Sequence, residues 1–360
     1  MRLFFQDFWH KKSKRIPFLR GVLFLISLLY KYGLSLWELS FRFKRLNMAP
    51  CPVVSVGNLT IGGQGKTPLV MKIASLFKES GFRVAIITRG YGRKKRGIFL
   101  VDPKIHLAQE CGDEALLLAK NLRCPVIVGK DRIKAIKKAV FECGADIAIL
   151  DDGFQVRGLK KDVEIVVFKT NMENFDLFPL GPMREPFDRI ARSDIVILNG
   201  KVKGPYKLPK HLFDSKPVFN SSLKALNLCN IKNKTYIDYR YLKGKEVVAF
   251  SGLADNDSFF ELLMSIGAKI KSAISFPDHY NYKPKDIKRI LRNHADIYVT
   301  TEKDAQKLEA QEIPDNFYYL TVEMAIEEEK EFFSTILALI EKKFSGELPW
   351  KRGSLSSTQL

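Results

Sequence analysis

A glycine-rich segment that ends in lysine and threonine is the clearest sign of chemistry in this 360-residue sequence. It runs Thr60, Ile61, Gly62, Gly63, Gln64, Gly65, Lys66, Thr67. Glycines let successive backbone N–H groups converge on phosphate oxygens, and the N-terminus of a following helix adds a favourable dipole. In such loops the lysine reaches the β- and γ-phosphates, and the next hydroxyl ligates Mg²⁺. The segment therefore predicts a binding site for a nucleoside triphosphate.

The spacing of this segment departs from the usual G-x-x-x-x-G-K-[ST] pattern, because Thr60 occupies the first glycine position. We expect Gly62 and Gly63 to supply the flexibility instead. The alternative is an ordinary glycine-rich turn with a chance G-K-T. The flanking residues favour phosphate binding: residues 52–56 form a β-branched run typical of a strand, and residues 68–80 carry apolar side chains at helical spacing.

Two aspartates, Asp151 and Asp152, directly follow the apolar run at residues 147–150. P-loop enzymes keep an acidic residue for the metal at the end of such a strand. Side chains alternate along a strand, so we expect at most one of the two to contact Mg²⁺ directly. The alternative is a turn, since Asp-Gly is common turn chemistry.

The elements that must position these residues alternate between strand and helix. Strands are predicted at residues 83–88, 125–128, 147–150, 162–168 and 194–198, and helices at 113–122 and 132–143. A second series has strands at 246–250, 269–275, 297–300 and 317–322 and helices at 258–266 and 285–293. This alternation predicts an α/β fold: a P-loop NTPase-like, doubly wound, mainly parallel sheet with a second, smaller α/β domain. Ligands of such sheets bind at the carboxyl ends of the strands.

The same pattern divides the chain into five parts. These are an N-terminal membrane-associated helical segment (1–50), a P-loop domain (51–216), a linker of two paired strands (217–241), a smaller α/β domain (242–344) and a flexible tail (345–360). The linker strands are expected at 217–226 and 235–241. If the second domain contributes to the site, closure between the domains would assemble it.

The composition limits the partners. Apolar residues make up 46% of the chain, which excludes wholesale disorder, and the formal net charge of +19 favours anionic ligands or surfaces. The five cysteines show no C-x-x-C pair, so neither a zinc ribbon nor a disulfide framework is indicated. A reducing cytoplasm fits best. Nucleic acid is not expected as a partner, because no RNA-binding signature or basic recognition helix is visible.

The N-terminal 50 residues carry much of this charge, with ten basic side chains against two acidic ones. Within them, residues 21–30 are uncharged, and Lys31 interrupts the apolar run. A spanning helix needs about 20 predominantly apolar residues, so we favour a segment that lies on an anionic membrane surface. A helical hairpin packed on the domain and a tilted span over residues 21–41 are the alternatives.

Seven short runs, in order along the chain, resemble those of the tetraacyldisaccharide 4'-kinase family. They are SVGNLTIGGQGKTP (55–68), TRGYGR (88–93), GDEALLLA (112–119), DDGFQ (151–155), PLGPMREP (179–186), FPDHYNY (276–282) and TEKDAQKL (301–308). The resemblance implies an ATP- and Mg²⁺-dependent kinase that phosphorylates the 4'-hydroxyl of a tetraacylated disaccharide 1-phosphate. The product would be the bisphosphorylated lipid A precursor lipid IVA, made on the cytoplasmic face of the inner membrane.

By the same resemblance, Asp113 is the carboxylate that faces the acceptor hydroxyl, and His279 is its partner from the second domain, with Lys66 completing the catalytic set. An Asp–His pair can share a proton and act as one general base. Without the resemblance, Asp113 would be a helix N-cap and His279 a residue of an ordinary turn.

Further candidates surround this set. Glu185 is a candidate metal ligand beside Thr67, Asp151 and Asp152. Candidate phosphate-binding residues for the substrate are Arg89, Arg93, Arg132 and Arg184. The alternatives are a surface ion pair for Arg184 with Glu185 and solvated side chains for the other arginines. A membrane-attached nucleotide switch is the second functional hypothesis, and it would need no His279.

Overall fold

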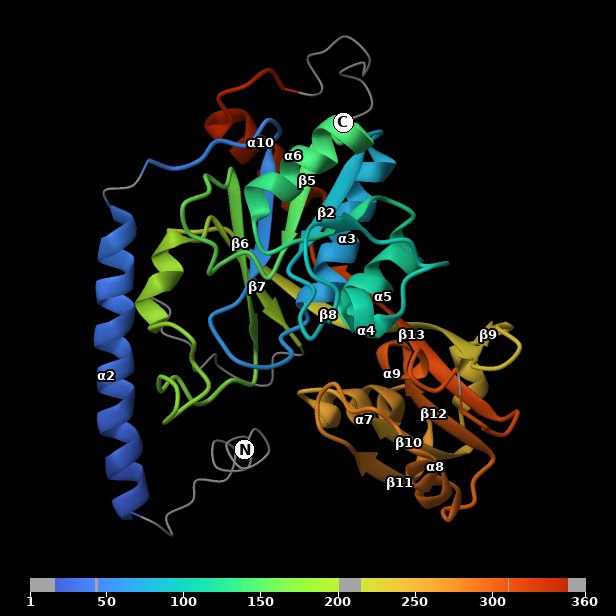
Figure 1. Ribbon diagram of the computed structural model, residues 1–360. Coiled ribbons are helices and arrows are strands. Elements are labelled where there is room, and N and C mark those ends of the chain that lie inside the picture. The colour runs from blue at the N-terminus through green and yellow to red at the C-terminus, as the bar shows by residue number, and fades with distance from the viewer. Residues whose placement is uncertain (1–16, 43–44, 201–214, 310, 349–360) are drawn as a thin grey trace.

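The computed structural model describes residues 17–42, 45–200, 215–309 and 311–348 (Figure 1). Strands of the described residues form one 13-stranded sheet, in the order β11-β10-β12-β13-β8-β7-β6-β1-β5-β2-β4-β3, with β9 paired to β8. Figure 1 shows the sheet in two parts: the strands from β1 to β7 form the upper part, and the orange elements form the lower one. We call these the first half and the second half of the molecule.

The first half has a parallel core. Its strands are β1 (Val53–Gly57), β2 (Val84–Thr88), β4 (Val126–Val128), β5 (Ile147–Asp151), β6 (Val163–Lys169) and β7 (Ile195–Asn199), and the short β3 (Phe99–Leu100) adds an antiparallel edge. β1 lies between β5 and β6, and its residue Val56 pairs with Asp151. The carboxyl ends of β1 and β5 are therefore neighbours, and the chain that leaves β1 starts beside the Asp151–Asp152 pair.

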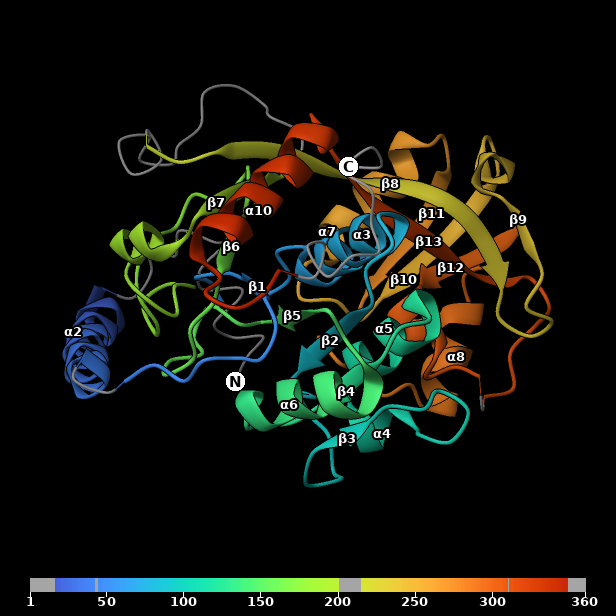
Figure 2. The same ribbon diagram turned by 90° about the horizontal axis from the view of Figure 1, so that it is seen from above.

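Helices cover both faces of these strands because consecutive strand residues point to opposite sides. One face packs on α3 (Lys66–Glu79), α5 (Asp113–Leu122) and α10 (Glu329–Lys343), with α4 (Ala108–Cys111) preceding α5. The other face packs on α6 (Arg132–Cys143) and, farther along, on η1 (Phe187–Arg192). Figure 2 shows α3 and α10 on one side of the central strands and α6 on the other. The predicted fold class is confirmed.

The second half repeats the parallel pattern on a smaller scale. It contains β10 (Glu246–Ser251), β11 (Lys269–Ser275), β12 (Ile297–Thr301) and β13 (Phe317–Ile326), together with α7 (Asn256–Ser265), α8 (Pro284–Leu291), α9 (Glu302–Ala305), β9 (Tyr236–Asp238) and η3 (Tyr239–Leu242). β10 pairs in parallel with β11 and β12, and β12 pairs in parallel with β13. α7 packs on one face of these strands and α8 on the other.

The connection between the halves differs from the predicted linker. β8 (Val218–Asn230) runs parallel to β7 and antiparallel to β13, whereas its pairing with β9 is limited to residues 227–229. The predicted pairing of 217–226 with 235–241 is therefore wrong over most of its length. The reason is that β13 is long enough to continue past Thr321 and pair with residues 221–225, which joins both halves into one sheet.

Helix α10 was expected in the smaller domain (242–344), but it packs on the first half. Its residues Phe332, Ile336 and Ile340 belong to the core of the first half, where the Phe332 ring lies 5.2 Å from that of Phe219. Leu348, expected in a flexible tail, is buried in the same core, and residues 349–360 of that tail lie outside the described residues. The chain thus returns from the second half to close the first.

A long helix, α2 (Pro17–Arg42), runs along one side of the first half (Figure 1). Its face at Leu23, Ser27, Tyr30 and Glu38 turns toward the protein, while most of its large apolar side chains are exposed, Leu29 at 72% and Leu25 at 61%. Within the described residues, α2 is the helix that is long and apolar enough to cross a membrane. The predicted segment begins earlier, but residues 1–16 lie outside the described ranges.

Candidate active site between the two halves

The predicted phosphate loop connects β1 to α3 and is held by the backbone of another predicted motif. Ile61 N donates to Pro182 O at 2.7 Å, and Arg184 N donates to Leu59 O at 2.7 Å. Thr60 forms an isolated bridge with Met183. The loop of residues 179–186 therefore acts as a brace for the start of the phosphate loop.

Position 65 requires glycine for two reasons, its backbone conformation and its close approach to a neighbouring side chain. Its φ is +89°, in the left-handed region, and it caps the N-terminus of α3. A Cβ at this position would also lie 2.3 Å from Asn199 Nδ2, the amide that donates to Gln64 O at 2.9 Å. Gly62 likewise has a positive φ, +116°. Backbone freedom at these two positions shapes the loop around the helix N-terminus.

Lys66 is the first residue of α3 and turns back toward the end of β5. Its Nζ lies 3.0 Å from Asn58 Oδ1 and 3.2 Å from Asp152 Oδ1, and its side chain is 14% exposed. Thr67, the next residue of α3, is half-buried. The predicted phosphate-binding lysine and the predicted metal-binding aspartates are therefore brought together.

The two aspartates have different surroundings. Asp151 is buried at the end of β5 and accepts a hydrogen bond from Thr88 Oγ1. Burial, with the neighbouring carboxylates of Glu114 and Asp152, raises the pKa of Asp151 well above its usual value. For Asp152 burial acts in the same direction, but Lys66 and Arg184 outweigh it and lower the pKa of that carboxyl. Asp152 also has a φ of +54°, the kind of strained backbone that is concentrated at functional sites.

These groups fit a magnesium ion. The crowding of negative charge that raises the pKa of Asp151 would be relieved by a divalent cation. Among the described residues, no three carboxylate, imidazole or thiolate groups converge in a closed cage. Mg²⁺ is typically held by one or two carboxylates together with substrate phosphates and water, so Thr67, Asp151 and Asp152 supply a sufficient donor set.

The second predicted pair is also formed, and it joins the two halves. Asp113 is the first residue of α5, and His279 lies in the loop after β11; His279 Nδ1 is 3.0 Å from Asp113 Oδ2. Burial alone would raise the pKa of Asp113, but the contacts with His279 and Lys307, with Lys303 nearby, lower it to about 2. Asp113 is therefore an anion at neutral pH.

The backbone of His279 is constrained for this contact. Its φ is +60°, which non-glycine residues rarely adopt, and its N–H donates to Gly252 O at 3.3 Å. The ring lies 5.5 Å from that of Tyr91, which belongs to the first half. His279 does lie in a turn, in which Tyr280 N donates to Pro277 O at 3.1 Å. The predicted turn and the contact with Asp113 are therefore both present, and the strained residue is held by its surroundings, as at Asp152.

The predicted phosphate-binding arginines separate into two groups. Arg132 is buried and interacts electrostatically with Asp151, Arg89, Asp152 and Arg93. Burial lowers the pKa of Arg132 to about 10, so the side chain stays cationic at neutral pH. Arg184 instead pairs with Asp152, with Nη1 3.1 Å from Oδ2. The first group gathers positive charge beside the aspartates, and Arg184 orients one of them.

Glu185 does not lie where a metal ligand was expected. Its Oε2 is 2.9 Å from Arg157 Nη2 and 2.6 Å from Arg192 Nη2. Both arginines also pair with Glu38 of α2, and Arg189 lies 2.6 Å from Glu38. Two guanidinium groups thus pair with the Glu185 carboxylate and link it to the residues that contact α2, and its role as a metal ligand stays a prediction.

Four residues at the site were not predicted from the sequence to belong to it. Asn58 holds Lys66, Asn199 packs on Gly65, and Lys303 and Lys307 contact the Asp113–His279 pair. Asn58, Lys303 and Lys307 lie within runs that carry the family resemblance, which was the available signal. Asn199 had none, because only the tertiary structure places the end of β7 against the phosphate loop.

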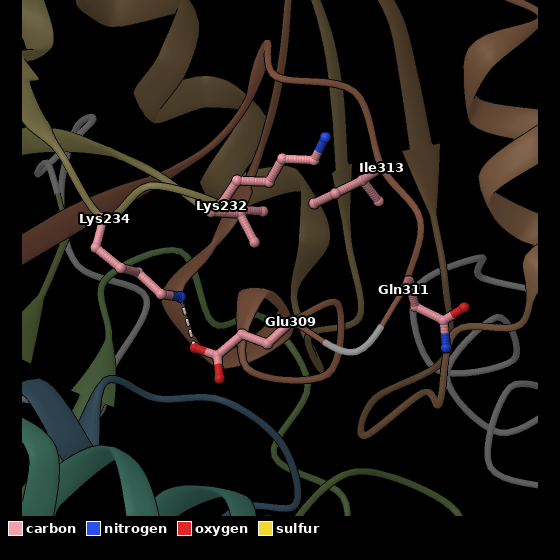
Figure 3. A pocket seen from close by; sticks show the side chains of 6 residues that line it. Lys232, Lys234, Glu309, Gln311 and Ile313 are labelled. Atoms are coloured by element: carbon pink, nitrogen blue, oxygen red, sulfur yellow. Dashed lines mark hydrogen bonds and ion pairs between the residues drawn. The ribbon is translucent and has the colours of Figure 1, made fainter.

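A separate hollow of about 300 Å³ lies in the second half, between residues 231–234 and 309–313 (Figure 3). Lys234 Nζ lies 2.8 Å from Glu309 Oε1 at this place. None of the predicted site residues lines it, so it is not part of the site described here.

Three comparisons with known proteins point to one family. The family model described as tetraacyldisaccharide-1-P 4'-kinase matches residues 19–341. The tetraacyldisaccharide 4'-kinase of Aquifex aeolicus is 37% identical over 80% of this chain and 88% of its own length. That of Syntrophus aciditrophicus is 36% identical over 92% and 95%. A crystal structure of LpxK from Aquifex aeolicus in complex with ATP superimposes with a TM-score of 0.74 and 34% identity, covering 89% of this chain and 99% of that one.

Proposed function

The chain belongs to the tetraacyldisaccharide-1-phosphate 4'-kinase family, and on that premise we propose how its residues carry out the reaction. The enzyme transfers the γ-phosphate of ATP to the 4'-hydroxyl of a tetraacyldisaccharide 1-phosphate and forms the bisphosphorylated lipid A precursor. The observation that carries the assignment of roles is the Asp113–His279 contact, which joins the two halves near a lysine-containing phosphate loop.

Binding of the donor falls to residues 60–67. The backbone N–H groups of this loop and the N-terminus of α3 supply a positive dipole for the phosphates. Lys66 binds the β- and γ-oxygens, and its present partners Asn58 and Asp152 keep its ammonium at the mouth of the loop. The positive φ values of Gly62 and Gly65 support this role, because they open the loop toward a ligand.

Thr67 together with Asp151 or Asp152 would hold Mg²⁺, which is typically bound by one or two carboxylates plus substrate phosphates. The ion would supply charge neutralisation for the transferred group. Arg184 keeps Asp152 oriented for this purpose. The positive cluster of Arg89, Arg93 and Arg132 is placed to bind a phosphate group of substrate or nucleotide.

Acceptance of the hydroxyl proton falls to Asp113. The carboxylate is ionised, and His279 fixes one of its oxygens. Phosphoryl transfer proceeds through a loose transition state in most analyses, so the acceptor proton leaves late and a weak base in the right position is sufficient. His279 comes from the second half, so the base is complete only when both halves are together.

Helix α2 attaches the enzyme to the membrane. It lies along the membrane surface and not across the bilayer. Tyr30 Oη donates to Arg184 O at 2.8 Å, and Glu38 pairs with Arg157, Arg189 and Arg192. The docked face from Leu23 to Glu38 is roughly 22 Å long at 1.5 Å per residue. A spanning helix docked over this length would carry those arginines into a hydrocarbon core of about 30 Å. An interfacial position on the cytoplasmic face of the inner membrane, with the exposed apolar side chains in the lipid, avoids this cost.

The division of the chain is proposed accordingly. Residues 51–216 form the phosphate-binding domain, which also includes α10 and Leu348, and residues from 242 to the end of β13 form the smaller domain. Strand β8 and the pairing β8–β13 connect them.

The test is an assay with the detergent-solubilised full chain, Mg-ATP and tetraacyldisaccharide 1-phosphate. We expect mass spectrometry to detect a lipid that has gained one phosphoryl group, and NMR to place the new ester at the 4'-position. A matched reaction with Lys66→Ala should give no product. ATP hydrolysis without phosphorylated lipid from the wild-type protein would contradict the proposal and favour a nucleotide switch.

A further inference from the structure

Two lysines from the second half lie against the Asp113–His279 pair. Lys307 Nζ is 2.8 Å from Asp113 Oδ2, and Lys303 Nζ is 3.3 Å from His279 Nε2. Their side chains are only 7% and 12% exposed. Burying two ammonium groups is costly unless each is compensated, so their position beside the general-base pair requires an explanation.

The segment that carries both lysines is firmly anchored. It begins with α9 after β12 and continues as a turn, in which Lys307 N donates to Asp304 O. Asp304 is fully buried, and its Oδ2 accepts hydrogen bonds from Gly252 N at 2.9 Å and Thr301 Oγ1 at 2.7 Å. His279 N donates to the carbonyl of the same Gly252. The lysines and the histidine are therefore held in one frame.

The hydrogen-bond partners of His279 indicate which ring nitrogen carries the proton. His279 Nε2 lies 3.3 Å from Lys303 Nζ and 3.8 Å from Asp278 Oδ1. Because an ammonium group has only donors, the closer neighbour favours a lone pair on Nε2. The ring proton is then on Nδ1, from which it is donated to Asp113 Oδ2. This arrangement favours the Nδ1–H tautomer of His279.

The carboxylate of Asp113 is oriented by the same contacts. Among the residues that the structure describes, its ion pair with Lys307 and its hydrogen bond with His279 both fall on Oδ2. Oδ1 is left for the acceptor hydroxyl. In the reaction the hydroxyl oxygen forms a bond to the γ-phosphorus as the bond to ADP breaks, and the hydroxyl proton passes to Oδ1 and then to solvent.

The remaining carboxylates around the pair balance the two ammonium charges. They are Glu114 beside Lys303, Asp278 beside His279 and Lys303, and buried Asp304 beside both lysines. The Cys111 thiol and the Tyr91 ring also lie beside the pair. Lys303 Nζ lies 3.3 Å from Asp278 Oδ1 and 3.9 Å from Glu114 Oε1. Burial raises the pKa of the Cys111 thiol to about 11, so that thiol stays neutral.

We infer that Lys303 and Lys307 are positioning residues for phosphoryl transfer: Lys303 keeps the imidazole proton of His279 on Nδ1, and Lys307 turns Asp113 so that Oδ1 faces the acceptor hydroxyl. This inference rests on the proposed roles of Asp113 and His279. The competing explanation is that the lysines only fasten the second half to the first, as Lys120 does by pairing with Glu309 at 3.6 Å.

The kinetic test compares Lys303→Met and Lys307→Met with the matched control Lys120→Met, from about pH 5 to about pH 9. We expect kcat to fall at least about tenfold in both site variants, the scale of general-base effects, with the ATP KM unchanged. In Lys303→Met the loss should be greatest at low pH and partly recover as pH rises, because a protonated imidazole weakens Asp113 as a base. Lys303→Arg and Lys307→Arg, which keep the charge, should recover most of the rate. Equal losses in all three methionine variants, a loss independent of pH, or no loss would overturn the inference.

A second readout does not depend on turnover. In protein labelled with ¹⁵N-histidine, with His279→Gln for assignment, two-bond ¹H–¹⁵N correlations should place the wild-type proton on Nδ1 at neutral pH, and Lys303→Met should abolish this preference. A proton on Nε2 in the wild type would overturn the inference even if the lipid is phosphorylated. Failure of the wild type to phosphorylate lipid, with the Nδ1–H tautomer present, would instead count against the proposed function.

Discussion

The proposed site has a donor side, which binds ATP, and an acceptor side, which activates the lipid hydroxyl. The two sides are built from different chemical groups. The groups proposed to bind ATP lie mainly in one short segment, residues 58–67, and many of them are backbone amides. The proposed acceptor side depends on side chains, and Asp113 and His279 are 166 residues apart in the chain. The proposed donor groups belong to the first half, whereas the proposed acceptor side exists only where the second half meets it. Binding of ATP and activation of the hydroxyl should therefore be separable.

The largest effect is expected on the donor side. Lys66→Ala should lower kcat/KM about a thousandfold, because it removes the cation that stabilises charge on the transferred phosphate. ATP affinity, measured by calorimetry, should fall as well. A variant that binds ATP normally and retains most of its turnover would remove Lys66 from the donor side.

On the acceptor side, Asp113→Asn should lower kcat about a hundredfold, since the amide cannot accept the hydroxyl proton. Its ATP affinity should match that of the wild type. Steady-state kinetics and calorimetry on the same preparation measure both quantities. Loss of ATP binding in this variant would contradict the separation of the two sides.

The metal belongs to the donor side, and its ligands can be tested individually. Asp151→Asn and Asp152→Asn should each raise the Mg²⁺ concentration for half-maximal activity, by about tenfold or more for the direct ligand. Titrating Mg²⁺ at fixed ATP identifies which aspartate has the larger effect. If neither changes the requirement for Mg²⁺, the metal is held elsewhere.

A smaller effect, on membrane binding, is expected from changes in α2, which lies outside the donor and acceptor sides. Replacing the exposed Leu25 and Leu29 together by Gln should weaken binding to anionic vesicles at least about tenfold, because it removes apolar surface from the lipid. ATP affinity should not change. The control Phe141→Gln alters an equally exposed apolar residue on α6, and vesicle sedimentation should be unaffected by it. Equal effects of both changes would contradict attachment through α2.

The same contrast explains what sequence alone could predict. The phosphate loop and the strands of the first half are signalled by spacing within a few residues, and α5 and α6 begin and end at the predicted positions. The pairing of Asp113 with His279 came from a resemblance, since no local pattern relates the two residues. The ion pairs of Glu185 with Arg157 and Arg192 could not be predicted, because these residues meet only in the folded chain.

Long-range packing accounts for the other differences between the predicted and the observed fold. α10 was assigned to the second half by its place in the sequence, but its apolar face fits the core of the first half, beside Phe219. β8 was expected to pair with its near neighbour in sequence and instead pairs with β13, which extends across both halves. In each case the choice among apolar partners is made by the tertiary structure, which local periodicity does not encode.

Single-turnover transfer of labelled phosphate from ATP to the lipid by His279→Gln, with ATP affinity determined in parallel, tests the separation of the two sides most directly. The variant should bind ATP as tightly as the wild type and transfer the phosphate at least about tenfold more slowly. Transfer at the wild-type rate, or a loss of ATP binding, would contradict an acceptor side that the second half completes.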